Sequence, residues 1–237
     1  MKQYVYCLTE RMNDLPSWRG VAGSSVYALE VDKFSVFASD FFGEHVRIDR
    51  ENVLAHAAVI QQVLNHTTPL PFKFGTLVTE QQLDNYVSAT REALQSKLAL
   101  VRGCVEMNVK IISSREPARA TASGNEHETP GTAFLFEKRR EIRGEEERAA
   151  EAIEIAAWLE AQLGDIVWET QINPNRLDKL LVAVAHLVRR EAVEEYRARL
   201  KEARHERPEL HFLISGPWAP YSFANIDLEF KTHFGVS

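Results

Sequence analysis

The sequence predicts an α+β protein of two domains, each a small sheet with helices packed on it, the C-terminal one ferredoxin-like. Strand-like and helix-like hydrophobic patterns alternate along both halves of the 237-residue chain. Segment 113–131 separates the halves, because it is rich in Ser, Gly and Pro and holds almost no large apolar residue. After it, the expected order is helix, strand, strand, helix, strand. The predicted division is a first domain at 1–115, a linker at 116–131 and a second domain at 132–237.

Three short strands are expected near the amino terminus, at 4–8, 26–31 and 34–38. They are rich in β-branched and aromatic residues, and Asp32-Lys33 between the last two predicts a hairpin turn. A further strand is expected at 104–112, where apolar residues alternate with Glu106, Asn108 and Lys110. One face of that strand should therefore pack on helices while the other is at least partly polar.

Two amphipathic helices lie between these strands. Asp49 is the expected N-cap of the first helix. Thr79, with Gln82 three residues later, predicts a capping box at the start of the second. Segment 70–77 joins the two helices and is predicted as one extended piece, since its prolines disfavour a helical backbone.

The second domain should begin with a long helix at 132–163 whose apolar stripe is Ile142, Ala149, Ile153 and Ala156. Strands are then expected at 165–172, 180–188 and 209–215, and a helix at 190–206. The continuous apolar run 180–188 is typical of a central strand covered on both faces.

The charge pattern argues against two classes of partner. The net charge is -6, and the basic cluster Lys138-Arg139-Arg140 is followed at once by glutamates. The chain therefore lacks the basic patch that nucleic-acid binding needs. No apolar run is long enough to span a bilayer, and no secretion signal is visible. We therefore expect a protein that is cytoplasmic, or attached to something assembled in the cytoplasm, with no lipid-membrane partner.

A search for catalytic and cofactor motifs yields little. No glycine-rich phosphate loop, paired histidine metal motif or nucleophile elbow is present, so the expectation is a protein without enzyme activity, cofactor or metal. Cys7 and Cys104 lie in apolar strand-like runs and are expected to be small buried residues. An enzyme with an unrecognised pocket around Glu106, Lys110 or His186 remains an alternative, although His186 is more typical of a hydrogen-bonded core residue. A coiled-coil scaffold at 132–163 is a further alternative, but its stripe is too broken for a heptad seam.

Two stretches combine stiffening prolines with large aromatic side chains, namely 69–76 and 216–224. Rigid aromatic segments make good interface anchors, and the alternative is that both are well-packed core loops.

Four segments of the chain form a recognisable series. They read YVYCLTE at the first strand, PLPFKFGTLVTEQQLDNYV, GCVEMNVKI, and LHFLISGPWAPYSFANI near the carboxyl end. All four resemble segments of one known family, the gas vesicle protein GvpL/GvpF family. They occur in the family's order and spacing and cover nearly the whole chain. The last is the most specific, and its one departure is Ala219, where the family usually carries a second proline.

The resemblance implies an accessory, minor structural protein that contacts the very hydrophobic shell subunit and other accessory proteins while gas vesicles are assembled in the cytoplasm. A chaperone-like or regulatory interaction module in a host without vesicles is the alternative. Self-association is left open. The motif residues expected to form an interaction patch, or else to lock the two domains together, are Pro71, Phe72, Phe74, Gly75, Glu106, Gly216, Pro217, Trp218, Pro220, Tyr221 and Phe223.

Overall fold

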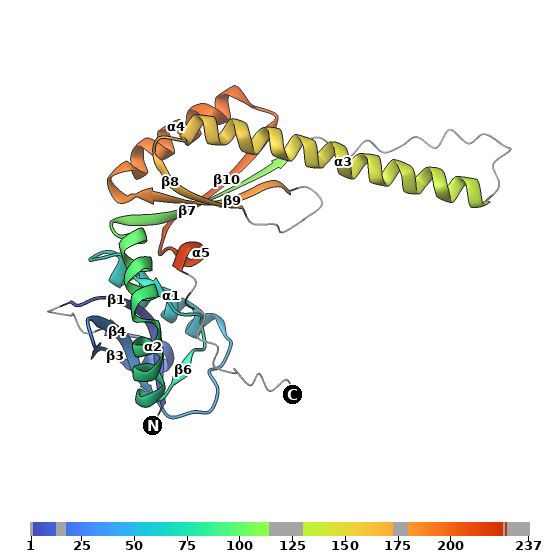
Figure 1. Ribbon diagram of the computed structural model, residues 1–237. Coiled ribbons are helices and arrows are strands. Elements are labelled where there is room, and N and C mark those ends of the chain that lie inside the picture. The colour runs from blue at the N-terminus through green and yellow to red at the C-terminus, as the bar shows by residue number, and fades with distance from the viewer. Residues whose placement is uncertain (1, 13–17, 114–129, 173–179, 225, 227–237) are drawn as a thin grey trace. The chain divides into compact units, whose positions relative to one another are not determined.

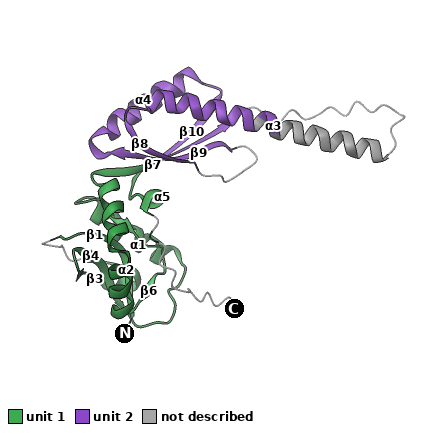
Figure 2. Cartoon of the chain, in the orientation of Figure 1, with its two compact units in different colours: residues 1–106, 216–237 green, residues 107–215 purple. Residues whose placement is uncertain are grey.

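The computed structural model describes residues 2–12, 18–113, 130–172, 180–224 and 226 (Figure 1). The chain divides into two compact units, and it leaves the first and later returns to it. Unit 1 comprises Met1–Glu106 and Gly216–Ser237, and unit 2 comprises Met107–Ser215 (Figure 2).

Unit 1 is built on a six-stranded sheet. The strands are β1 (Lys2–Glu10), β2 (Trp18–Arg19), β3 (Ser25–Val31), β4 (Phe34–Phe41), β5 (Leu70–Pro71) and β6 (Leu77–Val78). Their order is β2-β3-β4-β1-β5, with β6 also paired to β1. The hairpin predicted at Asp32-Lys33 is confirmed: β3 pairs antiparallel with β4, and Asp32 adopts the left-handed backbone (φ 55°) that such a turn requires.

Three helices belong to unit 1, namely α1 (Arg50–Leu64), α2 (Glu80–Val101) and the single turn α5 (Tyr221–Ala224); a short 3-10 turn spans Val21–Gly23. Both predicted caps are confirmed. The Asp49 carboxylate accepts a hydrogen bond from the Asn52 amide at 2.9 Å, and Thr79 and Gln82 form a reciprocal capping box.

The core of unit 1 forms where α1 covers the sheet. A cluster of buried residues joins side chains of β1, β4 and α1 to one residue that follows β10, Ala219. Cys7 and Cys104 are both buried, as expected. The carboxyl-terminal segment is thus part of this core although Ala219 lies 212 positions after Cys7 in the sequence.

Unit 2 has the βαββαβ element order of a ferredoxin-like fold. Its elements are β7 (Cys104–Ser113), α3 (Pro130–Leu163), β8 (Val167–Ile172), β9 (Leu180–Arg189), a 3-10 turn (Arg190–Ala192), α4 (Val193–Glu206) and β10 (Leu210–Trp218). The sheet order β10-β7-β9-β8 places the fourth strand beside the first, as that fold requires. Figure 1 shows α3 and α4 on the same side of this sheet. The ferredoxin-like prediction is therefore confirmed.

The observed units differ from the predicted division in two places. Strand β7 supplies the first strand of the ferredoxin-like sheet, so most of it belongs to unit 2 instead of the first domain. Residues from Gly216 onward belong to unit 1 instead of the second domain, because α5 packs against α2 and β5. The linker expected at 116–131 lies almost entirely outside the described residues.

Two local predictions were wrong. Segment 70–77 is not one extended piece, because β5 and β6 are separated by a turn in which the Thr76 amide donates to the Lys73 carbonyl at 3.2 Å. The predicted apolar stripe of α3 is also displaced. Ile153 is 71% exposed, and the buried residues in the described part of α3 are Ile155, Leu159 and Leu163, spaced four apart on a neighbouring face. The predicted stripe residue Ile142 lies outside the described side chains.

Candidate functional site

The carboxyl-terminal motif 216–224 combines a firmly anchored backbone with exposed aromatic side chains. Trp218, at the end of β10, is 46% exposed, whereas the next two residues, Ala219 and Pro220, are buried. The peptide bond between Gly216 and Pro217 is cis, and Gly216 has a φ of 126°, a conformation that side chains disfavour. The φ of Gly216 therefore explains why a glycine stands where the motif begins.

A buried carboxylate fixes the next part of the motif. Glu106 is only 4% exposed. Its Oε2 accepts a hydrogen bond from the Ser222 amide at 2.7 Å, and its Oε1 accepts one from the Ser222 hydroxyl at 3.0 Å. Hydrogen bonds to a charged acceptor are among the stronger ones in proteins. This pair joins the first turn of α5 to the start of β7, across 116 positions of sequence.

The turn α5 is closed by its own backbone. The Tyr221 amide donates to the Ala219 carbonyl at 2.8 Å, and the Ala224 amide donates to the Pro220 carbonyl at 2.8 Å. Phe223, Ala224 and Ile226 are buried, whereas Tyr221 is 45% exposed. The motif therefore alternates residues that anchor it with two aromatic residues, Trp218 and Tyr221, that remain accessible.

The second predicted motif, 69–76, is anchored against β1. The Phe72 amide donates to the Tyr6 carbonyl at 2.8 Å, and the Val5 amide donates to the Thr76 carbonyl at 3.2 Å. Gly75 has a φ of 87° and its amide donates to the Tyr4 hydroxyl at 3.2 Å. The glycine is thus required by the backbone of this turn.

Beneath this turn lies a buried polar and aromatic cluster. The Tyr4 hydroxyl is 2.8 Å from His56 Nδ1, and the rings of both residues pack edge-on against Phe74, at 6.2 and 5.7 Å between centroids. Burial lowers the pKa of His56 to about 4, so the imidazole is neutral near pH 7. Tyr4 and His56 were not singled out from the sequence, since neither residue type signals a motif when it occurs alone.

The predicted patch residues therefore fall into two groups. Trp218 and Tyr221 are exposed, and Phe74 is partly buried against the core of unit 1. The remaining motif residues set or fill the interior of unit 1: Pro71, Phe72, Glu106, Pro220 and Phe223 are buried, and Gly75, Gly216 and Pro217 are partly buried. Ser222 was not singled out from the sequence as the partner of Glu106, although it lies within the quoted motif.

The residues of the enzyme alternative are placed as follows. His186 is buried, its Nδ1 lies 2.7 Å from the Tyr196 hydroxyl, and burial lowers its pKa to about 4. It is thus the hydrogen-bonded core histidine that its apolar run predicted. Lys110 is exposed. Across the described residues, no group of three or more His, Cys, Asp and Glu side chains is arranged to hold a metal ion, and no helix has the length and hydropathy to cross a bilayer.

Comparison with known proteins decides the family. The family model described as "Gas vesicle synthesis protein GvpL/GvpF" matches residues 2–225, which include both aromatic motifs and Glu106. The chain belongs to the GvpL/GvpF family. The resemblance drawn from the quoted segments is thereby confirmed, and the family is one of gas vesicle proteins and is not a known enzyme family.

Named relatives come from haloarchaea. Gas vesicle protein F of Haloferax mediterranei is 27% identical over 235 residues, covering 95% of this chain and 94% of that protein. Gas vesicle protein L2 of Halobacterium salinarum is 24% identical over 254 residues, covering 94% and 91%. Relatives of both the F and the L type therefore match along almost their full length.

Two crystal structures of cyanobacterial members share the fold. The gas vesicle protein GvpF from Anabaena sp. PCC7120 superposes with a TM-score of 0.80 at 18% identity, covering 95% of this chain and 98% of that one. GvpF from Microcystis aeruginosa superposes with a TM-score of 0.78, also at 18% identity, covering 95% and 99%. The α+β class with two sheets is therefore shared with these GvpL/GvpF members.

Proposed function

We propose that this GvpL/GvpF member binds the hydrophobic shell subunit of gas vesicles, together with other accessory proteins, during vesicle assembly in the cytoplasm. It acts by non-covalent contact, without catalysis. Family membership supports the gas vesicle role, and the finer statement about partners rests on the side chains that unit 1 exposes.

The observation that carries the proposal is the exposure of Trp218 and Tyr221 on an anchored backbone. Two hydrogen bonds from Ser222 to Glu106, together with the buried Phe223, hold this segment in place. A partner that packs on rings already held in position orders few further groups, so less conformational entropy opposes binding. Large aromatic side chains of this kind often dominate the binding energy of an interface.

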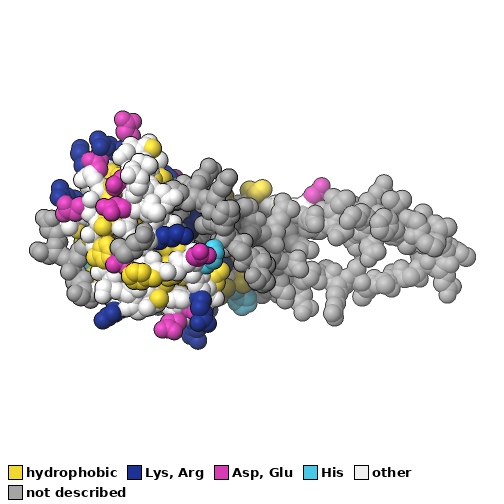
Figure 3. Space-filling model, turned by 90° about the horizontal axis from the view of Figure 1, so that it is seen from below, with side chains coloured by type: hydrophobic (Ala, Val, Ile, Leu, Met, Phe, Trp, Pro, Cys, Tyr) yellow, Lys and Arg dark blue, Asp and Glu magenta, His cyan; other side chains and the backbone are white. Residues whose placement is uncertain are grey.

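Unit 1 exposes other large apolar residues as well. Phe42, Ile48 and Leu54 are 89%, 75% and 56% exposed. On the face shown in Figure 3, hydrophobic side chains form groups among acidic and basic ones. An apolar partner could be covered by such a surface while the charged side chains around it keep the complex in solution.

The test is co-expression with the gas vesicle shell subunit, followed by affinity capture. We expect the native chain to retain the shell subunit through washing, and Trp218→Ala to lose most of it with an unchanged melting temperature. Trp168→Ala is the matched control, because Trp168 is 57% exposed but belongs to unit 2.

Three outcomes count against the proposal. Failure of the native chain to retain a soluble shell subunit would reject shell binding. Equal losses in both tryptophan variants would reject the motif as the contact. A loss of stability in Trp218→Ala would instead assign this side chain to the interior, as the domain-lock hypothesis holds.

A further inference from the structure

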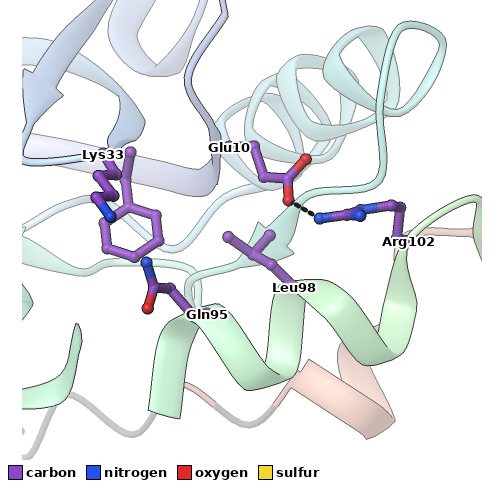
Figure 4. Close-up of a pocket in the computed structure, with 6 residues that line it drawn as sticks. Glu10, Lys33, Gln95, Leu98 and Arg102 are labelled. Carbon is purple, nitrogen blue, oxygen red and sulfur yellow. Dashed lines mark hydrogen bonds and ion pairs between the residues drawn. The ribbon is translucent and has the colours of Figure 1, made fainter. Parts of the chain in front are cut away.

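Unit 1 has a second surface feature, distinct from the aromatic motif. A cavity of about 370 Å³ lies between α2, the end of β1 and the β3–β4 turn. It is lined by Glu10, Lys33, Phe34, Gln95, Leu98 and Arg102. Figure 4 shows Gln95, Leu98 and Arg102 reaching from α2 toward Glu10 and Lys33. Its volume lies within the range of small-ligand sites.

Two ion pairs hold α2 against the strands on either side of this cavity. Arg102, at the end of α2, pairs with Glu10 at the end of β1. Arg91, about three turns earlier on α2, pairs with Asp32 in the hairpin turn at 2.6 Å. Positions 91, 95, 98 and 102 recur at helical spacing and therefore share one face of α2. The cavity lies along that face, between the two paired arginines.

The lining divides into an apolar floor and a polar rim. Phe34 and Leu98 are 2% and 3% exposed, so they present fixed hydrocarbon at the base. Glu10, Lys33, Gln95 and Arg102 are exposed and form the rim. A ligand with an apolar body could rest on the floor and place a polar group at the rim.

The charges at the rim favour an anion. The cavity is lined by two cations and one carboxylate, and that carboxylate is already paired with Arg102. Lys33 forms no ion pair with any carboxylate in the described part of the chain. Lys33 and Gln95 both line the cavity, and their side chains carry an ammonium group and an amide with two N–H donors. The negative end of the α2 dipole weakens anion binding nearby, but Arg102 is located at that end and opposes it.

We infer that this cavity binds a carboxylate carried on an apolar group, with the apolar part on Phe34 and Leu98 and the carboxylate at Lys33 and Gln95. The carboxylate can belong to a free organic acid or to the terminal residue of a partner protein. This site is separate from the aromatic motif. The inference therefore holds whether or not the shell subunit binds the aromatic motif.

Benzoate is the first probe, and benzamide is its uncharged control of nearly the same shape. Binding is followed on the full chain by the shifts of backbone amide signals on titration. We expect benzoate to shift signals near Lys33, Gln95 and Arg102, with at least about tenfold weaker binding of benzamide, because only the carboxylate makes charge-assisted hydrogen bonds.

Lys33→Met keeps the apolar stem and removes the charge, so it should weaken benzoate binding about tenfold or more. Lys2→Met is the matched control, since Lys2 is an exposed lysine at the opposite end of β1. An acetylated peptide ending in phenylalanine, compared with its carboxyl amide, distinguishes the two sources. Preference for the free carboxyl peptide over benzoate favours a protein terminus, and the reverse favours a small acid.

The inference is overturned by any of three results: equal binding of benzoate and benzamide, no shift near the cavity up to about 10 mM benzoate, or unchanged binding by Lys33→Met. The first two are measured on the native chain, so they do not depend on how the variants fold.

Discussion

Glu106 and Ser222 lie 116 positions apart, yet both carboxylate oxygens of Glu106 accept hydrogen bonds from Ser222, at 2.7 Å from its amide and 3.0 Å from its hydroxyl. Glu106 is the last residue of the amino-terminal part of unit 1. It holds in place the carboxyl-terminal segment that completes this unit. This attachment holds the backbone that carries the exposed rings of Trp218 and Tyr221.

Glu106→Gln should destabilise unit 1 by about 1–3 kcal/mol. The glutamine amide keeps one acceptor oxygen, but its NH₂ group would face one of the two Ser222 groups that donate to Glu106. Ser222→Ala removes only the hydroxyl bond and should cost about 1 kcal/mol. Hydrogen exchange of the β1 amides under native conditions reports on unit 1 alone. Glu160→Gln, at an exposed position of α3, is the control, and an equal effect there would contradict the role of Glu106.

Phe72 and Phe42 should respond very differently to truncation although both are phenylalanines of unit 1. Phe72 is 1% exposed and Phe42 is 89% exposed. Phe72→Ala should cost about 3–5 kcal/mol through lost burial and a residual cavity. Phe42→Ala should change stability by less than about 0.5 kcal/mol. Urea unfolding followed by exchange of β1 amides measures both, and similar losses would show that the assigned burial is wrong.

Stability should fall as the pH drops from about 6.5 to 4. Burial lowers the pKa of both His56 and His186 to about 4, from an ordinary value of 6.5. In that window the unfolded chain binds protons that the folded chain does not, so acid favours unfolding. Each histidine should cost about 2 kcal/mol at pH 5 relative to pH 7.

His186→Gln removes one of these two titrations and should flatten the pH dependence of unit 2, read from exchange of the β9 amides. The exposed His205 supplies the control variant His205→Gln, which should leave the slope unchanged. A slope that is the same in native chain and His186→Gln would show that His186 titrates normally in the fold.

Gly20→Ala should destabilise unit 1 through a steric conflict. A Cβ at this position would lie 2.0 Å from the Tyr6 hydroxyl oxygen and 2.6 Å from its ring. That hydroxyl is itself held, since it accepts from the Val21 amide at 2.9 Å and lies 3.0 Å from Ser39 Oγ. Overpacking of this kind costs about 1–3 kcal/mol.

The same conflict can be tested with a double-mutant cycle. Tyr6→Phe removes the hydroxyl, so in its presence Gly20→Ala should cost less than it does alone. Strict additivity of the two free-energy changes would show that the substituted alanine does not meet Tyr6.

Much of the fold could be predicted from local sequence, and the failures share a physical cause. Caps at Asp49 and Thr79 and the hairpin at Asp32 depend on residues a few positions apart, and all were correctly predicted. The prediction of the buried face of α3 was wrong, because two apolar stripes compete in its sequence. Only tertiary packing decides that Ile155 is buried and Ile153 is exposed. The membership of β7 in unit 2 likewise depends on strand pairing across the sheet, which no local pattern reveals.

The site was predicted less completely than the fold. Both aromatic motifs were located from the sequence, but the sequence did not show which of their rings are exposed. Phe223 and Tyr221 are both large aromatic residues, yet only Phe223 is buried. Glu106 was placed on the polar face of its strand, and the structure shows it buried with a partner in a distant motif. A buried acid cannot be told from an exposed one unless its partner is known.

Unit 2 is contiguous, from Met107 to Ser215, whereas unit 1 needs residues from both ends of the chain. A ribosome therefore releases every residue of unit 2 before it delivers Ala219, Ser222 and Phe223 to unit 1. Until then the two hydrogen bonds from Ser222 to Glu106 cannot form, and the hydrophobic surface that those residues cover is open. The unit whose exposed rings we propose for partner binding is thus the last to be completed, so a nascent chain acquires its interaction surface only when synthesis has passed the motif.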